Sequence, residues 1–233
     1  MKFVNKFGTI NVLAPTENFT RKTIGLSMSG GADSTMLCIL LAKAIQEKGR
    51  KLDTIIQPFS GYDLWAPLDS AGLPEIITFI KSEFPDVQIN WPISVVFDTK
   101  GDHDKDKNKY IIPLVNQLAK KRLINCIISG ISRGPELEDQ LTFNVKDKKC
   151  AIQRIPGYRL WNEVSNQPDE LAPYKHVDKR FVIQCYKDLG YESLLEKTAS
   201  CTHPAGDCGV CWWCEERKWA INAVFNKNNQ NDN

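Results

Sequence analysis

The chain has 233 residues, enough for one large domain or for a domain with a small appendage. Hydrophobic residues make up 42% of it and charged residues 25%, and this composition excludes collagen-like, coiled-coil and wholly disordered proteins. The net charge of +2 is too small to indicate a nucleic-acid or membrane partner, so such a partner would need a local charged patch.

The start of the chain predicts neither secretion nor membrane insertion. Residues 1–20 include Lys2 and Lys6 but no apolar segment of the type found in signal peptides. The longest apolar run, residues 36–42, is far shorter than a membrane-spanning helix. We therefore expect a cytoplasmic protein without a membrane partner.

Between residues 22 and 132, short apolar runs alternate with longer periodic stretches, a pattern typical of strands and helices around a parallel sheet. The charged residues 100–109 are expected to form a solvated loop. We predict an α/β fold with a Rossmann-like parallel sheet. The predicted strands are residues 23–28, 54–59, 93–97 and 126–131, and the predicted helices are residues 34–48, 74–84 and 110–122.

The second half of the chain has a different character. Residues 133–173 contain four prolines and no sustained periodicity, so we expect loops that face the substrate. Helical periodicity returns at residues 178–189 and 212–225, where Trp219, Ala220, Ala223 and Val224 are predicted to form an apolar face. These features predict two domains, residues 1–175 and a small helical appendage at residues 176–233.

A glycine-rich turn, Ser29-Gly30-Gly31-Ala32-Asp33-Ser34, lies between a predicted strand and a predicted helix. Such a turn can direct backbone N–H groups at a phosphate, and the helix dipole favours the anion. The spacing is not that of a Walker A loop. The alternative is a plain turn in which Asp33 or Ser34 caps the helix.

This turn resembles the signature Ser-Gly-Gly-x-Asp-Ser of the PP-loop, or N-type, ATP pyrophosphatases, which have the adenine nucleotide alpha hydrolase-like fold. The resemblance implies that ATP is cleaved between its α and β phosphates and that a substrate carboxylate or amide is adenylated. It also implies a magnesium ion, ordered with the help of Asp33. By this resemblance the ATP-binding residues are Ser27, Met28, Ser29, Gly30, Gly31, Ala32, Asp33, Ser34 and Thr35.

Four of the eight cysteines crowd into a short C-terminal segment, while Cys38, Cys126, Cys150 and Cys185 are scattered and are expected to be mostly buried thiols. Tight spacings let one tetrahedral ion collect four thiolates, so the sequence predicts a structural zinc site. A four-iron cluster uses the same ligands, and unmetallated or disulfide-bonded cysteines are a further alternative. The predicted zinc ligands are Cys201, Cys208, Cys211 and Cys214.

The cysteine segment is similar to the C-terminal motif of the 7-cyano-7-deazaguanine synthases. The matching residues are Thr198-Ala199-Ser200-Cys201 and Cys208-Gly209-x-Cys211-x-x-Cys214-x-x-Arg217, preceded by Leu171-Ala-Pro173, Lys179, Val182 and Leu189-Gly190. The resemblance implies a cytosolic, dimeric enzyme of queuosine or archaeosine precursor synthesis. Such an enzyme adenylates 7-carboxy-7-deazaguanine, captures ammonia as the amide, then activates the amide and dehydrates it to the nitrile.

Three residues are predicted to be catalytic: Asp33, Arg133 and Lys179. Arg133 follows the fourth predicted strand at the carboxyl edge of the sheet, where a cation could stabilise the α-phosphate in its transition state. Lys179 is the second candidate cation. The alternative for these two residues is a surface arginine and a helix-capping lysine.

Several aromatic and acidic residues have two interpretations each. Packing is favoured over base stacking for Trp212 and Trp213, beside the cysteines. Phe59, Tyr62 and Trp65 fit a purine pocket or the core equally well, and Tyr158 to Trp161 offers aromatic rings and a cation to a ligand. The acidic residues Glu136, Glu138 and Asp139 suit magnesium, a guanine edge or plain solvation.

We predict an ATP-dependent ligase that makes 7-cyano-7-deazaguanine from 7-carboxy-7-deazaguanine and ammonia, with magnesium and structural zinc. Alternatives are a related ligase that stops at the amide or acts on another carboxylate, including a protein C-terminus. A PP-loop tRNA thiolation enzyme is a further rival, although the near-neutral charge gives no strong nucleic-acid signal. A non-catalytic zinc-knuckle binding module is the rival from outside the enzymes.

Overall fold

The structure is a computed structural model, and it describes residues 1–12, 22–49, 53–64, 71–98, 108–145, 172–201, 203 and 208–226. Its described strands are β1 (Lys2–Asn5), β2 (Gly8–Asn11), β3 (Lys22–Ser27), β4 (Thr54–Asp63), β5 (Gln88–Ile89), β6 (Ile93–Phe97) and β7 (Cys126–Ile128). Its described helices are α1 (Ala32–Glu47), α2 (Leu73–Glu83), α3 (Asn108–Lys120), α4 (Leu137–Leu141), α7 (Lys179–Asp188), α8 (Glu192–Glu196) and α9 (Trp212–Phe225).

A parallel sheet forms the centre of the molecule. Strand β3 pairs with β4 on one side and with β7 on the other, and β4 also pairs with β5 and, further along, with β6. Every pairing in this sheet is parallel, which confirms the predicted α/β class. Because the chain passes from β3 to β4 on one side and later returns to β7 on the other, the topology switches between β3 and β7. In open α/β sheets ligands bind at such a point.

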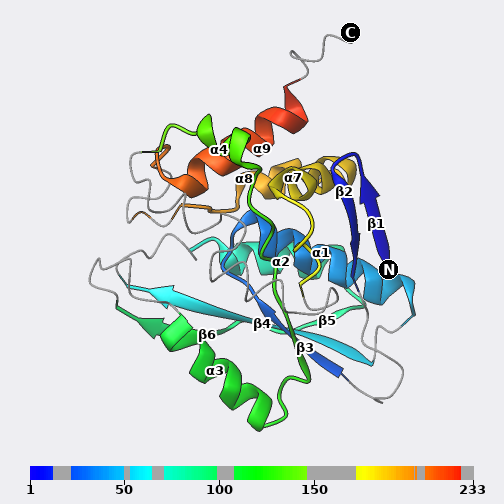
Figure 1. The fold of residues 1–233 in the computed structure, drawn as a ribbon. Helices are drawn as coiled ribbons and strands as arrows, with labels where there is room; N and C mark the ends of the chain where they lie inside the picture. The colour runs from blue at the N-terminus through cyan, green and yellow to red at the C-terminus, as the bar shows by residue number, and fades with distance from the viewer. Residues whose placement is uncertain are drawn as a thin grey trace.

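The helices cover both faces of the sheet. Figure 1 shows α3 below the sheet, α1 and α2 above it, and α7 and α9 in a further layer beyond α1. The main core includes residues of β3, α1 and α2 together with Phe181 and Val182 of α7 and Val224 of α9. A smaller cluster of buried residues contains Phe59 of β4, Leu118 of α3 and Ile124. The described residues on both sides of the predicted domain boundary therefore share one core, and the division into two domains stays a prediction.

An antiparallel hairpin of β1 and β2 was not predicted from the sequence. Asn5 closes its turn, because its Oδ1 accepts the N–H of Phe7 at 2.9 Å, and its Nδ2 donates to the carbonyl of Phe181 at 3.1 Å. Gly8, with φ of +143°, faces Val177, and a Cβ there would lie 2.8 Å from that side chain. The Asn5 to Gly8 spacing is the sequence signal that could have revealed the hairpin.

The predicted strands and helices agree with the structure to within a few residues at most ends. The strand over residues 93–97 and the helix over residues 212–225 are confirmed at both ends. The predicted strand over 126–131 is wrong at its end, because β7 stops at Ile128 before Gly130. Ala223 is exposed and does not belong to the apolar face of α9, which is built on Ala220 and Val224.

In the part of the chain that the structure describes, no helix combines the length and the apolar character needed to cross a membrane. The charged segment at residues 100–109 and most of the predicted substrate loops lie outside the described residues.

Gly61 marks the place where α3 and β6 approach β4 most closely. A Cβ at Gly61 would lie 2.8 Å from the ring of Phe97 and 3.1 Å from Ile111, which is closer than packed atoms tolerate. We expect Gly61→Ala to lower the free energy of unfolding by about 1 to 3 kcal/mol in urea denaturation. Val96→Ala on neighbouring β6 is the control, because Val96 is 60% exposed and its truncation should change stability by about 0.5 kcal/mol at most. Equal stability of Gly61→Ala and the wild type would contradict this packing.

Candidate active site and cysteine cluster

The glycine-rich turn joins β3 to α1 at the carboxyl edge of the sheet. Gly30 has φ of +81°, a left-handed conformation that glycine adopts without strain. Gly31 is the N-cap of α1 and has no side-chain cap, and Thr35 N–H donates to the Gly31 carbonyl at 3.1 Å. Asp33 therefore lies inside the first helical turn, and the alternative in which Asp33 or Ser34 caps the helix is wrong. The positive end of the α1 dipole is left available for an anion.

A cavity of about 300 Å³ opens at this turn. One wall is the turn itself, and a second consists of residues 129–131, which follow β7 across the switch point. Gly130 backs directly onto α1, since a Cβ there would lie 3.1 Å from the Cα of Ser34. The third wall comes from the C-terminal part of the chain and contains Ala199, Ser200 and Trp213. Segments far apart in the sequence thus meet at the predicted nucleotide site.

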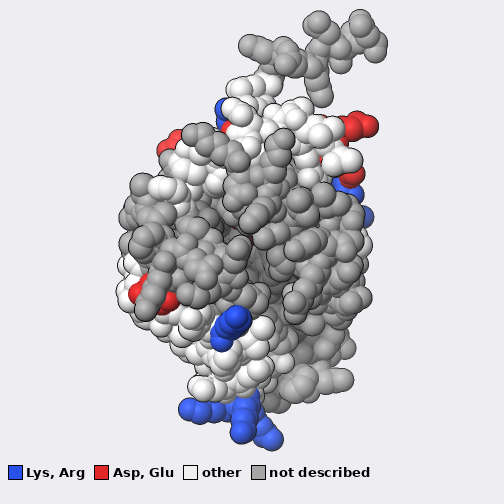
Figure 2. All heavy atoms as spheres, turned by 60° about the vertical axis from the view of Figure 1, so that its left-hand side comes forward, with Lys and Arg blue, Asp and Glu red and all other residues white. Residues whose placement is uncertain are grey.

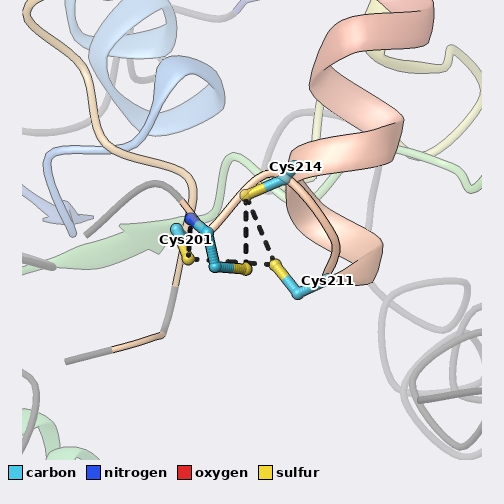
Figure 3. A group of neighbouring side chains, drawn as sticks. Cys201, Cys211 and Cys214 are labelled. Carbon is cyan, nitrogen blue, oxygen red and sulfur yellow. Dashed lines mark hydrogen bonds between the residues drawn. The ribbon is translucent and has the colours of Figure 1, made fainter. Parts of the chain in front are cut away.

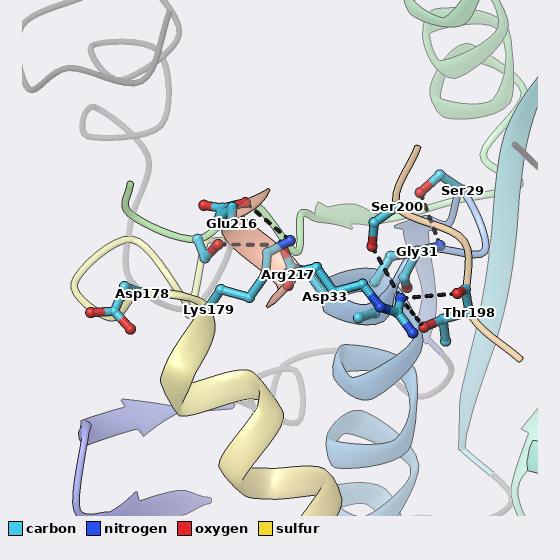
Figure 4. Close-up of polar contacts among 12 residues, drawn as sticks. Ser29, Gly31, Asp33, Asp178, Lys179, Thr198, Ser200, Glu216 and Arg217 are labelled. Carbon is cyan, nitrogen blue, oxygen red and sulfur yellow. Dashed lines mark hydrogen bonds and ion pairs between the residues drawn. The ribbon is translucent and has the colours of Figure 1, made fainter. Parts of the chain in front are cut away.

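Lys179, the first residue of α7, lies between two carboxylates at the edge of this cavity (Figure 4). Its Nζ is 3.2 Å from Oδ2 of Asp33 and 3.2 Å from Oε2 of Glu216, which belongs to α9. The side chains of Lys179 and Glu216 are 5% and 0% exposed. Buried charges need such partners, because desolvation of an unpaired charge is costly. With two carboxylates on one ammonium group, the triad has a formal charge of −1.

The two carboxylate oxygens of Asp33 differ in their hydrogen bonds. Its Oδ2 accepts from Ser132 Oγ at 3.3 Å and faces Lys179, whereas Oδ1 is buried without a hydrogen-bond partner among the described residues. A buried carboxylate oxygen without a donor is unfavourable unless a cation or a ligand completes it. The arrangement suits a bound cation beside the glycine-rich turn.

Of the three predicted catalytic residues, the structure brings Asp33 and Lys179 together at the cavity. Arg133 does not line it. Its guanidinium forms an ion pair with Glu136 at 2.7 Å, and its backbone N–H donates to the carbonyl of Val177 at 2.9 Å. Its catalytic role stays a prediction, as do the roles assigned to Asp33 and Lys179.

The four clustered cysteines converge at the start of α9 (Figure 3). All four Sγ atoms lie within 4.8 Å of one another, with separations of 3.5 Å for Cys211 and Cys214, 3.9 Å for Cys211 and Cys201, and 4.0 Å for Cys208 and Cys214. Four thiolates about 2.3 Å from a single zinc ion form a tetrahedron with edges of about 3.8 Å. A four-iron cluster places each thiolate on a different iron and spreads the sulfurs further apart. The donor set and its spacing fit one tetrahedral metal ion.

Hydrogen bonds to sulfur favour thiolates in this cluster. Backbone N–H groups of His203 and Cys208 donate to Cys201 Sγ at 3.3 and 3.4 Å. Burial opposes ionisation of Cys208, but hydrogen bonds from Val210, Cys201 and Cys211 outweigh it and lower the pKa of this thiol to about 7. Burial raises the pKa of Cys211 to about 11. A metal ion would have to displace the proton of Cys211, so its affinity should rise with pH.

Arg217 connects α9 to the segment that leads into Cys201. Its guanidinium donates to the carbonyl of Leu195 at 2.6 Å, and to the carbonyl and Oγ1 of Thr198 at 2.9 and 2.7 Å (Figure 4). The N–H of Ala199 in turn donates to the carbonyl of Gly30 at 3.1 Å. The motif contains Arg217, but nothing in the sequence showed that it holds the third wall of the cavity in place. The part played by Glu216 was also missed, and no sequence signal identifies it.

The remaining aromatic, acidic and cysteine candidates lie in different surroundings. Trp212 is fully buried and packs on Phe143 with ring centroids 5.0 Å apart, which confirms packing for this residue. Trp213 is half-buried and lines the cavity. Phe59 is a core residue. Asp139 accepts a hydrogen bond from Nε1 of Trp219 at 3.3 Å. Trp65, Cys150, Tyr158 and Trp161 lie outside the described residues.

Surface charge is mixed on the face drawn in Figure 2. Lysine and arginine side chains lie near the lower centre, at the lower edge and beside acidic side chains at the top and upper right, while a further acidic group lies at the left. The described residues visible on this face form no continuous basic patch.

Similarity to known proteins is found among solved structures. No protein-family model and no curated protein sequence matches the chain. Among solved structures, it is similar to the U34-tRNA thiolase NcsA from Methanococcus maripaludis with its 4Fe-4S cluster. The TM-score is 0.43 and the sequence identity 9%, and the match covers 89% of this chain and 68% of the thiolase.

Replacement of one clustered cysteine should remove the metal. We expect Cys211→Ser to lose bound metal and to melt at a lower temperature, because three thiolates and a hydroxyl hold the ion weakly and its binding contributes to folding. Metal content by mass spectrometry and thermal denaturation are the measurements. Cys126→Ser is the control, since Cys126 lies on β7 away from the cluster, and it should keep its metal. A Cys211→Ser protein with a full metal complement would contradict the assignment.

The buried thiols should resist alkylation. Burial raises the pKa of both Cys38 and Cys185 to about 12, so at pH 8 roughly one molecule in ten thousand carries the reactive thiolate. Peptide mass spectrometry after iodoacetamide treatment should find both residues unmodified in the folded protein and modified in guanidinium. Modification of Cys38 at similar rates in both samples would show that the site is open to solvent.

Proposed function

We propose that the chain is an ATP-dependent enzyme of the PP-loop ATP pyrophosphatase superfamily. The observation that carries this proposal is the position of the Ser-Gly-Gly-x-Asp-Ser turn. It begins α1 without a side-chain cap, at the topological switch point between β3 and β7, and it opens into a cavity that Lys179 and Asp33 border. A helix start with available N–H groups suits the phosphates of ATP.

A magnesium ion would offset the negative charge that the carboxylates and ATP bring to this site. The triad of Asp33, Lys179 and Glu216 has a formal charge of −1, and ATP is itself an anion. A divalent cation removes the repulsion between them, and Oδ1 of Asp33 is the available protein oxygen for it or for one of its water ligands. When bound, the cation would neutralise charge that develops on the phosphates. Lys179 would orient Asp33 toward it.

The proposed reaction begins with the activation of a carboxylate. A carboxylate oxygen attacks the α-phosphorus of ATP, the bond to the bridging oxygen breaks, and pyrophosphate leaves with the electron pair. Ammonia then attacks the carbonyl carbon of the acyl adenylate, and AMP leaves with its oxygen as an amide forms. Adenylation is needed because a carboxylate is a poor electrophile and hydroxide a poor leaving group. The helix start and the walls of the cavity supply the positioning.

We further propose 7-carboxy-7-deazaguanine as the carboxylate and 7-cyano-7-deazaguanine as the product. The support is the match of residues 198–217 to the motif of the synthase family. In the second half of the reaction, the amide oxygen attacks the α-phosphorus of a second ATP and pyrophosphate leaves. AMP then leaves with that oxygen, and loss of the amide protons gives the nitrile. Zinc in the four-cysteine cluster would be structural, because four thiolates leave no open coordination position for a substrate.

A turnover assay tests this proposal. The protein is incubated with ATP, magnesium, ammonium and 7-carboxy-7-deazaguanine, and mass spectrometry follows AMP, the amide and the nitrile. AMP together with nitrile is the expected result. Amide alone would restrict the function to the first half of the reaction. The absence of substrate-dependent AMP would overturn the proposed substrate, and the same assay with other carboxylates and with tRNA would then identify the class of acceptor.

The identity of the bound metal would distinguish the proposed ligase from a thiolation enzyme with an iron-sulfur cluster. A four-iron cluster absorbs visible light and zinc does not, so an anaerobically purified sample can be assigned by its absorption spectrum and its iron and zinc content. We expect zinc, in agreement with the short sulfur separations. Iron and acid-labile sulfide in a ratio close to one would support the thiolase instead.

Asp33 can be removed without exposing a lone buried charge. In Asp33→Ala, Lys179 keeps its ion pair with Glu216, so the fold should persist. We expect substrate-dependent pyrophosphate release to fall by roughly 100-fold or more, the magnitude typical of a lost electrostatic group. Asp53→Ala, at an exposed position before β4, is the control and should keep its activity. A soluble Asp33→Ala protein with wild-type turnover would exclude a catalytic role for Asp33.

A further inference from the structure

The cavity has more surface than the phosphates of a nucleotide require. Besides the turn and Lys179, its lining includes Ile131, Ser200 and Trp213. An anion-binding turn has no use for an indole ring. The indole instead suits a planar ring, which is a different chemistry from that of the phosphates.

Trp213 lines the cavity from the first turn of α9. The two adjacent tryptophans diverge, because Trp212 is buried against Phe143 while Trp213 stays half-buried at the cavity. Trp213 also lies between two of the four metal-ligating candidates, Cys211 and Cys214, in the first turn of α9. A metal there would fix the backbone on both sides of the indole. Such preorganisation lowers the entropic cost of ligand binding.

The chemistry around the indole defines the ligand. Hydroxyl groups of Ser29, Ser129 and Ser200 line the same cavity, so an aromatic face lies among hydrogen-bonding groups. This combination suits a flat ring whose edges carry donors and acceptors, because the face stacks and the edges form hydrogen bonds. An aliphatic carboxylate would leave the indole face without a matching surface.

We propose that Trp213 is the stacking wall of the acceptor subsite and that it selects a planar heteroaromatic carboxylate. This inference rests on the proposed function, since it takes the second ligand to be the group that the nucleotide activates. It deepens that function, because the specificity comes from a tryptophan between two metal ligands rather than from the phosphate-binding turn. The metal, through α9, would then hold the element that selects the substrate.

Binding measurements with separate probes test the inference. Calorimetry with the full-length, metal-loaded protein determines affinities for 7-carboxy-7-deazaguanine, for aliphatic glutarate and for α,β-methylene ATP. We expect the wild type to bind the deazapurine and not glutarate. Trp213→Ala should weaken deazapurine binding about 10-fold or more, as expected for the loss of one stacking contact, while the affinity for the ATP analogue stays within about twofold.

Two further variants exclude a merely structural effect. Trp213→Phe keeps an aromatic face and should restore most of the deazapurine affinity, with metal content equal to that of the wild type. Trp91→Ala removes a tryptophan that is 56% exposed and contacts Lys81 away from the cavity, and it should bind all probes normally. If Trp213→Ala loses its metal, Trp213→Phe and Trp213→Leu provide the comparison of aromatic with aliphatic side chains.

The outcomes separate this inference from the proposed function. Deazapurine binding that depends on Trp213, without AMP formation in the turnover assay, would sustain the subsite and overturn the reaction. Unchanged deazapurine affinity in Trp213→Ala would overturn the subsite, whatever the reaction. A loss of affinity for the ATP analogue as large as that for the deazapurine would also overturn it, since the indole would then contact the nucleotide.

Discussion

The ammonium group of Lys179 is the contact on which the arrangement of the site depends. It lies within 3.2 Å of carboxylates from α1 and α9 and is itself on α7, so one buried charge joins three helices. Removal of a single partner from a buried ion pair costs about 3 to 5 kcal/mol, because the remaining charge is left without compensation. The three helices therefore hold one relative position, and Asp33 presents Oδ2 to Lys179 while its buried Oδ1 has no hydrogen-bond partner among the described residues.

Around this contact, the two motifs of the sequence form one site. The segment before Cys201 is held on one side by Arg217 and on the other by the hydrogen bond from Ala199 to Gly30. Gly31 permits this approach, because a Cβ there would lie 3.1 Å from the carbonyl oxygen of Ala199. The glycine-rich turn and the segment that leads into the cysteine cluster are thus in contact through the backbone, although about 170 residues of sequence separate them.

Local patterns in the sequence were sufficient for most of the fold. Hydrophobic periodicity identified α1, α2 and the strands β3, β4, β6 and β7 of the sheet, and the Ser-Gly-Gly turn and the clustered cysteines were evident from residue type and spacing alone. The short elements β5, α4 and α8 were missed because two to five residues carry too little periodicity to be distinguished from loops.

The tertiary contacts of the site could not be predicted from local sequence patterns. Glu215 and Glu216 form an acidic pair typical of a solvated helix face, yet Glu216 is fully buried because α9 packs on α7 where Lys179 needs a counter-charge. Trp212 and Trp213 are identical residues at adjacent positions, and only the direction of α9 decides which one packs in the core and which one faces the cavity. Such assignments follow from the packing of distant segments.

The wide sequence separation of the cavity walls has a consequence for synthesis on the ribosome. The lining residues are translated at different times, first those of the turn at residues 29–34, then residues 129–131, and last Ala199, Ser200 and Trp213. Strand β3 pairs with β7 across about 100 residues, so the switch point itself cannot form until β7 has left the exit tunnel. A nascent chain consequently carries an incomplete site throughout elongation. The cavity is complete only after α9 has emerged and docked.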